Sequence, residues 1–198
     1  MPLIPLTQNT HIMSQEKIIL GIDPGTIIMG FGLIKIVNKK MEFLQLNELL
    51  LQKYKDPYIK LKLIFERTIE LIDTYHPDEI ALEAPFMGKN PQSMLKLGRA
   101  QGVAMAAGLS RDIPVTEYAP KKIKMAVTGN GNASKEQVAK MLQSLLKLKT
   151  LPKNLDSTDG LAAAVCHFYN SGRSINTAGK NYTGWASFVS QNEGRVKK

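Results

Sequence analysis

The stretch Ile18–Ile34, IILGIDPGTIIMGFGLI, decides the fold because it joins two apolar runs through a Pro-Gly turn signal. The first run predicts a strand over Lys17–Ile22, and the second predicts a strand over Met29–Val37. One carboxylate, Asp23, lies inside this apolar stretch. An ionised carboxylate in apolar surroundings is costly unless a cation or hydrogen bonds compensate it. Asp23 is therefore either the first residue of a turn or part of a functional site.

The apolar patterns that follow predict an α/β fold. A third strand completes an antiparallel meander, and the order after it is helix, strand, helix, strand, helix, helix. We expect these elements at Met41–Leu50, Leu61–Ile72, Glu79–Ala84, Ser93–Leu109, Ile113–Ala119, Ser134–Leu148 and Asp156–Tyr169. This order predicts a mixed five-stranded sheet flanked by helices. We expect residues 17–170 to form one domain, with an N-terminal extension over 1–16 and a disordered basic tail over 171–198.

The composition narrows the class of protein. The chain has 198 residues, a formal net charge of +9 and one cysteine, Cys166. A single cysteine excludes an intrachain disulfide and a cysteine cluster for zinc, which fits the cytoplasm. No apolar run approaches the roughly 20 residues of a membrane helix, so we expect no membrane association. The positive charge favours a polyanionic partner such as nucleic acid.

Four acidic residues lie in apolar sequence. Asp23 ends the first expected strand, and Glu83 lies near the end of the fourth. Asp156 and Asp159 are three residues apart at the start of the last helix, which places them on one helical face. Taken singly, Asp23 is also explained by a turn, Glu83 by a partly exposed strand, and Asp156 by a helix cap.

Taken together, these acids predict a metal site. Neighbouring first and fourth strands bring Asp23 and Glu83 together, and the last helix supplies the other two carboxylates. Crowded carboxylates raise each other's pKa, and divalent cations relieve the repulsion. Oxygen ligands without Cys or His suit Mg²⁺, for which Mn²⁺ can substitute. Two such ions about 3.5–4 Å apart form an arrangement that cleaves phosphodiesters.

At these residues the chain resembles RuvC-type Holliday junction resolvases. The resemblance rests on four motifs in order, which are ILGIDPGT…GFGLI, ALEAPFMGKNPQSMLKLGRAQGVAM, EYAPKKIKMAVTGNGNASKEQV and LDSTDGLAAAVCH. It implies a ribonuclease H-like fold and a homodimer that nicks two opposing strands of a four-way DNA junction. It also implies 5′-phosphate products, recombination and repair as the setting, and the bacterial RuvA–RuvB branch-migration complex as a partner.

The resemblance also implies roles for individual residues. It carries the catalytic and metal-binding roles onto Asp23, Glu83, Asp156 and Asp159. It implies that Phe86 contacts junction bases, that Lys124 and Lys135 face DNA near the site, and that the helix Ser93–Leu109 forms the dimer contact. Charge alone adds Lys121 and Lys122 as DNA-binding residues, because the segment 121–149 holds seven lysines against one acid, Glu136.

Two other classes of protein share part of this pattern. Actin-like ATPases and sugar kinases also carry a GIDPGT-like phosphate loop, but they need a second loop and a far longer chain. A non-catalytic junction-binding protein would keep the lysines and Phe86 without needing four acids. The four motifs together favour the metal-dependent endonuclease.

Overall fold

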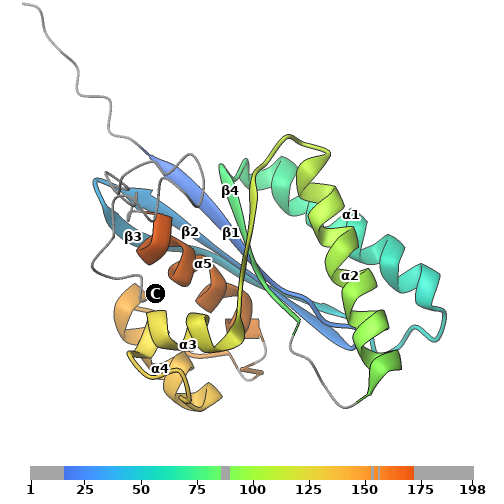
Figure 1. Cartoon of the computed structure of the whole chain (residues 1–198). Helices are drawn as coiled ribbons and strands as arrows, with labels where there is room; N and C mark the ends of the chain where they lie inside the picture. Colours follow the sequence, from blue (N-terminus) through green and yellow to red (C-terminus); the bar gives the residue numbers. More distant parts are fainter. Residues whose placement is uncertain (1–15, 86–89, 153, 156, 172–198) are drawn as a thin grey trace, which may run out of the picture.

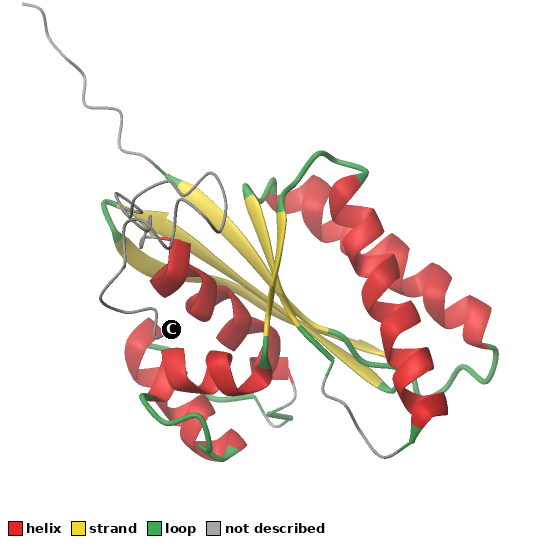
Figure 2. Ribbon diagram, in the orientation of Figure 1, coloured by secondary structure: helices red, strands yellow, loops and turns green. Residues whose placement is uncertain are grey.

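The residues that the structure describes form a mixed five-stranded sheet with helices on both faces (Figure 1; Figure 2). The computed structural model describes residues 16–85, 90–152, 154–155 and 157–171. The strands are β1 (Lys17–Asp23), β2 (Ile28–Val37), β3 (Lys40–Leu50), β4 (Glu79–Glu83) and β5 (Val115–Tyr118). The helices are α1 (Pro57–Tyr75), α2 (Pro91–Leu109), α3 (Pro120–Thr128), α4 (Lys135–Leu146) and α5 (Ser157–Ser171). In these described segments, no helix has the length and apolar character needed to cross a membrane.

The strand order β3-β2-β1-β4-β5 places β1 in the centre of the sheet. β1 pairs with β2 in antiparallel register, from Lys17 opposite Ile36 to Asp23 opposite Gly30. β1 pairs with β4 in parallel, and β4 pairs with β5 in parallel. These pairings confirm the predicted meander and the mixed sheet. Because β1 and β4 are parallel neighbours, both strands end at the same edge of the sheet.

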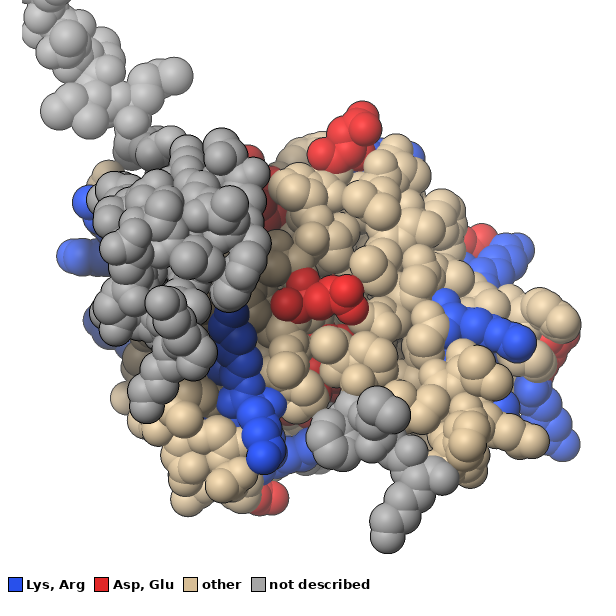
Figure 3. Space-filling model, viewed as in Figure 1, with Lys and Arg blue, Asp and Glu red and all other residues tan. Residues whose placement is uncertain are grey.

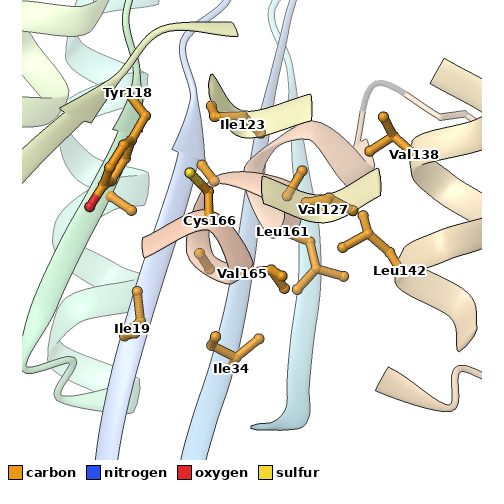
Figure 4. Packing of buried hydrophobic residues seen from close by; sticks show 14 of the residues in the cluster. Ile19, Ile34, Tyr118, Ile123, Val127, Val138, Leu142, Leu161, Val165 and Cys166 are labelled. Atoms are coloured by element: carbon orange, nitrogen blue, oxygen red, sulfur yellow. The ribbon is translucent and has the colours of Figure 1, made fainter. Parts of the chain in front are cut away.

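Two apolar layers cover the two faces of the sheet. On one face Leu20 and Ile22 of β1 pack with residues of α1 and α2. On the other face Ile19 packs with residues of α3, α4 and α5, including Leu142 and Val165, and Figure 4 shows this second layer from close by. This alternation along β1 is what a strand buried on both faces requires. α5 therefore lies inside the molecule, directly on the central strands.

The region around α3 and α4 differs in part from the expectation. The helix α3 was not among the predicted elements, because Pro120 directly follows the expected strand Ile113–Ala119 and proline commonly ends a strand. Pro120 instead occupies the first turn of a helix, where its missing N–H costs nothing. The expected helix after Ser134 is confirmed as α4, and the Ser134 side chain accepts a hydrogen bond from the Gln137 backbone N–H in a capping box.

Glycines allow α5 to lie against the sheet with backbone touching backbone. A Cβ placed on Gly21 of β1 would lie 2.0 Å from the Gly160 carbonyl oxygen of α5. A Cβ on Gly32 of β2 would lie 2.3 Å from the Leu161 Cα, and one on Gly160 would lie 2.7 Å from the Gly30 carbonyl oxygen. No side chain can turn away from these clashes, because the obstructing atoms belong to the main chain. The three glycines therefore fix the depth of α5 on β1 and β2.

Gly21→Ala is expected to destabilise the fold. The added methyl group must push α5 off the sheet, which places the cost at about 3 kcal/mol, the upper end for overpacking. Urea unfolding followed by circular dichroism measures this change as a lower midpoint at an unchanged slope.

Gly98→Ala on α2 is the matched control, because among the described residues nothing outside the adjoining turns of α2 lies within 4 Å of a Cβ placed there. Alanine is also the better helix former, so this variant should unfold at the parent's midpoint or above it. Equal midpoints for Gly21→Ala and the parent would contradict the close packing of α5.

Candidate active site

The parallel pairing of β1 and β4 brings two of the predicted carboxylates together. Ile22 lies opposite Leu82 in the register, and the next residues along the two strands are Asp23 and Glu83. Gly21 and Ala81 lie on the face of the sheet that α5 covers. Residues two positions apart on a strand share a face, and Asp23 and Glu83 come two positions after these residues. Both acids therefore lie on the α5 side of the sheet, at the edge where β1 and β4 end. Both side chains are partly exposed to solvent.

The first turn of α5 brings a third carboxylate, Asp159, to the same edge. Its neighbour Gly160 contacts the carbonyl oxygen of Gly30, and Gly30 is the residue that pairs with Asp23. The Asp159 side chain is 18% exposed, and one of its oxygens lies 2.8 Å from the Lys135 ammonium at the start of α4. The glycine contact of α5 thus sets how close Asp159 approaches the strand ends.

The electrostatics of Glu83 show how crowded this edge is. Burial, and after it the negative charge of Asp159, raises the pKa of Glu83 from 4.5 to about 7. The ammonium groups of Lys135 and Lys124 act in the opposite direction and are outweighed. An additional cation among these carboxylates would offset the cost of ionised Glu83, which arises first from burial and then from Asp159.

The donor set suits a hard divalent cation, because it consists of carboxylate oxygens without Cys or His. Lys135 already supplies a positive charge to Asp159, which shows that this position favours a cation. Within the described residues, no three acidic, His or Cys side chains form a group that could hold a metal ion. Asp156, the fourth predicted ligand, lies outside the described residues, as does Phe86.

The predicted lysines fall into two groups. Lys124 of α3 and Lys135 of α4 lie close enough to Glu83 to act on its pKa. Lys121 and Lys122 are exposed on the first turn of α3, and the Lys122 ammonium lies 4.9 Å from the centre of the Tyr118 ring. Lys124 and Lys135 are therefore close to Glu83, whereas Lys122 lies beside Tyr118, the residue opposite Glu83 in the register of β4 and β5.

A second polar cluster inside the molecule was not predicted as a unit. His167, which is 5% exposed, forms hydrogen bonds through Nδ1 with the Tyr118 hydroxyl at 2.8 Å and through Nε2 with Glu79 at 2.6 Å. Lys17 pairs with the other Glu79 oxygen. Glu79 opens β4 and Glu83 ends it, so this cluster lies toward the opposite end of the strand. It joins α5 to the sheet and accounts for His167 without a catalytic role.

A mixed sheet of this order, with carboxylates at the ends of its two central parallel strands, defines the ribonuclease H-like nucleases as the class. The sequence model described as "Crossover junction endodeoxyribonuclease RuvC" matches residues 19–167. The chain belongs to the RuvC family of crossover junction endodeoxyribonucleases. The relative of that name from Christiangramia forsetii is 75% identical over 94% of this chain and 96% of its own length, and the one from Bacteroides fragilis is 58% identical over 92% and 97%.

Solved structures agree with this assignment. The structure described as "T. thermophilus RuvC in complex with Holliday junction substrate" superimposes with a TM-score of 0.72 and 29% identity, over 78% of this chain and 94% of that one. A second structure of Thermus thermophilus RuvC superimposes with a TM-score of 0.69 and 28% identity, over 78% of this chain and 96% of that one. These likenesses confirm the predicted fold and the predicted family.

Glu83→Gln is expected to stabilise the metal-free protein at high pH only. The folded chain keeps a proton on Glu83 up to about pH 7, whereas an ordinary Glu loses it near 4.5. The stability of the parent therefore falls as the pH rises between these values. Glutamine cannot ionise, so the variant does not lose this stability. In EDTA we expect the variant to gain roughly 1–3 kcal/mol over the parent at pH 8 and almost nothing at pH 5, as measured by urea unfolding.

Glu79→Gln is the matched control on the same strand. Burial works to raise the pKa of Glu79, but its hydrogen bonds to Lys17 and His167 outweigh burial and lower it. This stabilisation is complete above the usual pKa and is lost only in acid, so Glu79→Gln should be less stable than the parent at both pH values. A Glu83→Gln gain that is the same at pH 5 and pH 8 would show that Glu83 does not carry this penalty.

Proposed function

We propose that this chain is a metal-dependent, structure-selective endonuclease that resolves four-way DNA junctions by paired symmetric nicks during recombination and repair. The observation that carries the proposal is that Asp23, Glu83 and Asp159 lie at one edge of the sheet in a chain of this family. These three do not by themselves form a group that could hold an ion, so the proposal also draws on Asp156 and on an approach of the ligands when the metal binds. A protein that only bound junctions would not need a carboxylate as costly as Glu83 at that edge. The solved relative in complex with a Holliday junction substrate supports this choice of DNA structure.

Asp23, Glu83, Asp159 and Asp156 are the residues that would hold the metal. Mg²⁺ is the ion that their oxygen donors suit best, with Mn²⁺ as a substitute and two ions in each site. When bound, such ions would lower the pKa of the attacking water and neutralise negative charge that develops at the phosphate. The four carboxylates would be catalytic in this sense, because they would hold the metal that acts on the phosphate.

The basic side chains around the carboxylates position the DNA backbone. Lys124 and Lys135 lie beside Glu83 and Asp159, where they would contact the phosphates flanking the cut. Lys121 and Lys122 extend this surface along α3. When a phosphate binds, Lys135 can exchange its ion pair with Asp159 for a contact with the DNA.

Phe86 is assigned to the bases at the crossover. It follows Glu83 by three residues in the segment that leads from β4 to α2. An aromatic ring there can stack on an unpaired base, which a junction offers and an intact duplex does not.

The second half of the proposal is a homodimer formed through α2. An exposed apolar stripe runs along this helix, in which Leu95 is 64% and Leu109 is 57% exposed and exposed Gly98, Gly102 and Ala106 lie between them. Small residues allow two helices to approach closely, and a two-fold dimer matches a nearly two-fold junction. This dimer acts in the bacterial cytoplasm with the RuvA–RuvB branch-migration complex.

Asp23→Asn is expected to separate binding from cutting. The amide keeps the size of the side chain but removes a charged metal ligand, so nicking of a synthetic four-way junction in Mg²⁺ should fall more than about 100-fold. Binding of the same junction in Ca²⁺ should stay close to that of the parent. A gel assay of the nicked arms and a fluorescence binding assay measure the two quantities.

Three controls make this test decisive. The parent should nick two opposing strands of the junction symmetrically in Mg²⁺ and none in EDTA, and it should leave a linear duplex of the same sequence largely uncut. Normal nicking by Asp23→Asn would contradict the assignment of Asp23. Equal cutting of junction and duplex by the parent would contradict structure selectivity.

Gly102→Arg tests the dimer. A Cβ on Gly102 meets no described atom within 4 Å beyond the adjoining turns of α2, so an arginine there should leave the fold intact. Across a close α2–α2 contact it should shift the molar mass, measured by light scattering, from dimer to monomer. A dimer that persists in a folded Gly102→Arg variant would exclude this face of α2 as the interface.

A further inference from the structure

A basic cavity lies beside the strand ends, on the side away from α3 and α4. It has a volume of about 370 Å³ and opens between the starts of α1 and α2. Among the described residues its wall holds four cationic side chains and no carboxylate, and Leu61 and Ile64 are part of its apolar lining. The cations come from two helices and the loop before α1: Lys55, Lys60, Lys96 and Arg99.

No carboxylate neutralises these four side chains within the part of the chain that the structure describes. None of them forms an ion pair there, whereas Lys62 and Arg111 pair with Glu66 and Asp73. The nearest acid in the sequence, Asp56, accepts a hydrogen bond from the Tyr58 backbone N–H at the start of α1. Four uncompensated cations around one cavity repel one another, and an anion would relieve this repulsion.

The cavity is joined directly to the carboxylate edge. Thr26, which lines it, follows Asp23 by three residues, so their Cα atoms are at most roughly 11 Å apart. The Lys60 ammonium donates a hydrogen bond to the Thr26 carbonyl oxygen at 2.8 Å, and this contact leaves its charge uncompensated because a carbonyl is neutral. A phosphate held in the cavity would therefore be only a few nucleotides from one at Asp23.

The molecule thus carries positive charge on both sides of the strand ends. Lys124 and Lys135 lie on the α3 and α4 side, and the cavity cations lie on the α1 and α2 side. Figure 3 shows basic side chains over α1 and α2 on the right of the molecule, apart from those at the lower left. The N-termini of α1 and α2 add little further capacity to bind an anion. Asp56 already accepts a hydrogen bond from a backbone N–H in the first turn of α1, and Asn90 accepts two from the first turn of α2.

We infer that this cavity is a second phosphate-binding site, which holds a backbone phosphate of the junction on the side of the cut opposite to α3. The inference rests on the proposed function for the identity of the polyanion. Lys55, Lys96 and Arg99 contact the phosphate, and Lys60 holds the Thr26 turn against it. With cations on both sides, the DNA backbone is fixed across the carboxylates rather than at one side of them.

The test is the triple variant Lys55→Gln, Lys96→Gln and Arg99→Gln. All three side chains are exposed, so the fold should tolerate the change. The variant should bind a synthetic four-way junction in EDTA about 10-fold or more weakly than the parent at 100 mM salt. Its plot of log affinity against log salt should be shallower by about one for each phosphate that the variant no longer neutralises.

A control of equal charge change is Lys39→Gln, Lys62→Gln and Arg111→Gln. These side chains are exposed and lie away from the cavity, in the β2–β3 turn, in α1 and after α2. The control should bind with nearly the parent's affinity and with the same salt slope.

Each outcome of this test has one meaning. Parent-like affinity and slope in the cavity variant, or an equal loss in both triple variants, would overturn the second phosphate site. A parent protein that binds no junction at all would instead contradict the proposed function.

Discussion

The contact between α5 and the glycines of β1 and β2 is the constraint on which the rest of the structure depends. Gly21, Gly32 and Gly160 let a helix backbone touch a sheet backbone, with no side chain between them. Because every residue of α5 from Ser157 to His167 except Asp159 is buried, this contact also fixes the inner layer of the core. Any larger residue at these positions would lift α5 away from the sheet and move Asp159 with it.

From that contact the electrostatics of the edge follow. Asp23 and Glu83 are held by the register of β1 and β4, which is set by hydrogen bonds that cannot slide without exchanging the faces of the sheet. Asp159 is brought in by α5, and its charge adds to the effect of burial in raising the pKa of Glu83. Ionised Glu83 therefore lowers the stability of the folded chain, and a bound cation would offset this loss. The surplus of lysine and arginine, +9 in net charge, supplies a surface for the polyanion that the chemistry requires.

The order of the strands and most helices could be predicted from the sequence, because apolar periodicity and Pro-Gly signals are local. The meeting of Asp23 and Glu83 could also be predicted, since parallel neighbours end at one edge. The helix α3 was missed because Pro120 ends a strand and starts a helix at once. The glycine contacts were missed because a glycine within a strand indicates close approach without naming the element that approaches.

Other features needed the three-dimensional arrangement. The cavity cations come from segments about 40 residues apart, and only the packing of α1 beside α2 brings Lys60 near Arg99. The same is true of the hydrogen bonds that join His167 to Tyr118 and Glu79. Neither the cavity cations nor the His167 cluster has a fixed spacing along the chain. From the sequence alone, the cations look like ordinary surface charges and His167 looks like an isolated histidine.

The central claim is that the strand ends and the first turn of α5 form one divalent-cation site. Its most direct test is nuclear magnetic resonance of ¹⁵N-labelled protein with substoichiometric Mn²⁺, whose unpaired electrons broaden the signals of nearby amides. The account predicts selective broadening around Asp23, Glu83 and Asp159, reversed by excess Mg²⁺. Broadening centred on other residues, such as Glu79 and His167, or no selective broadening at all, would contradict it.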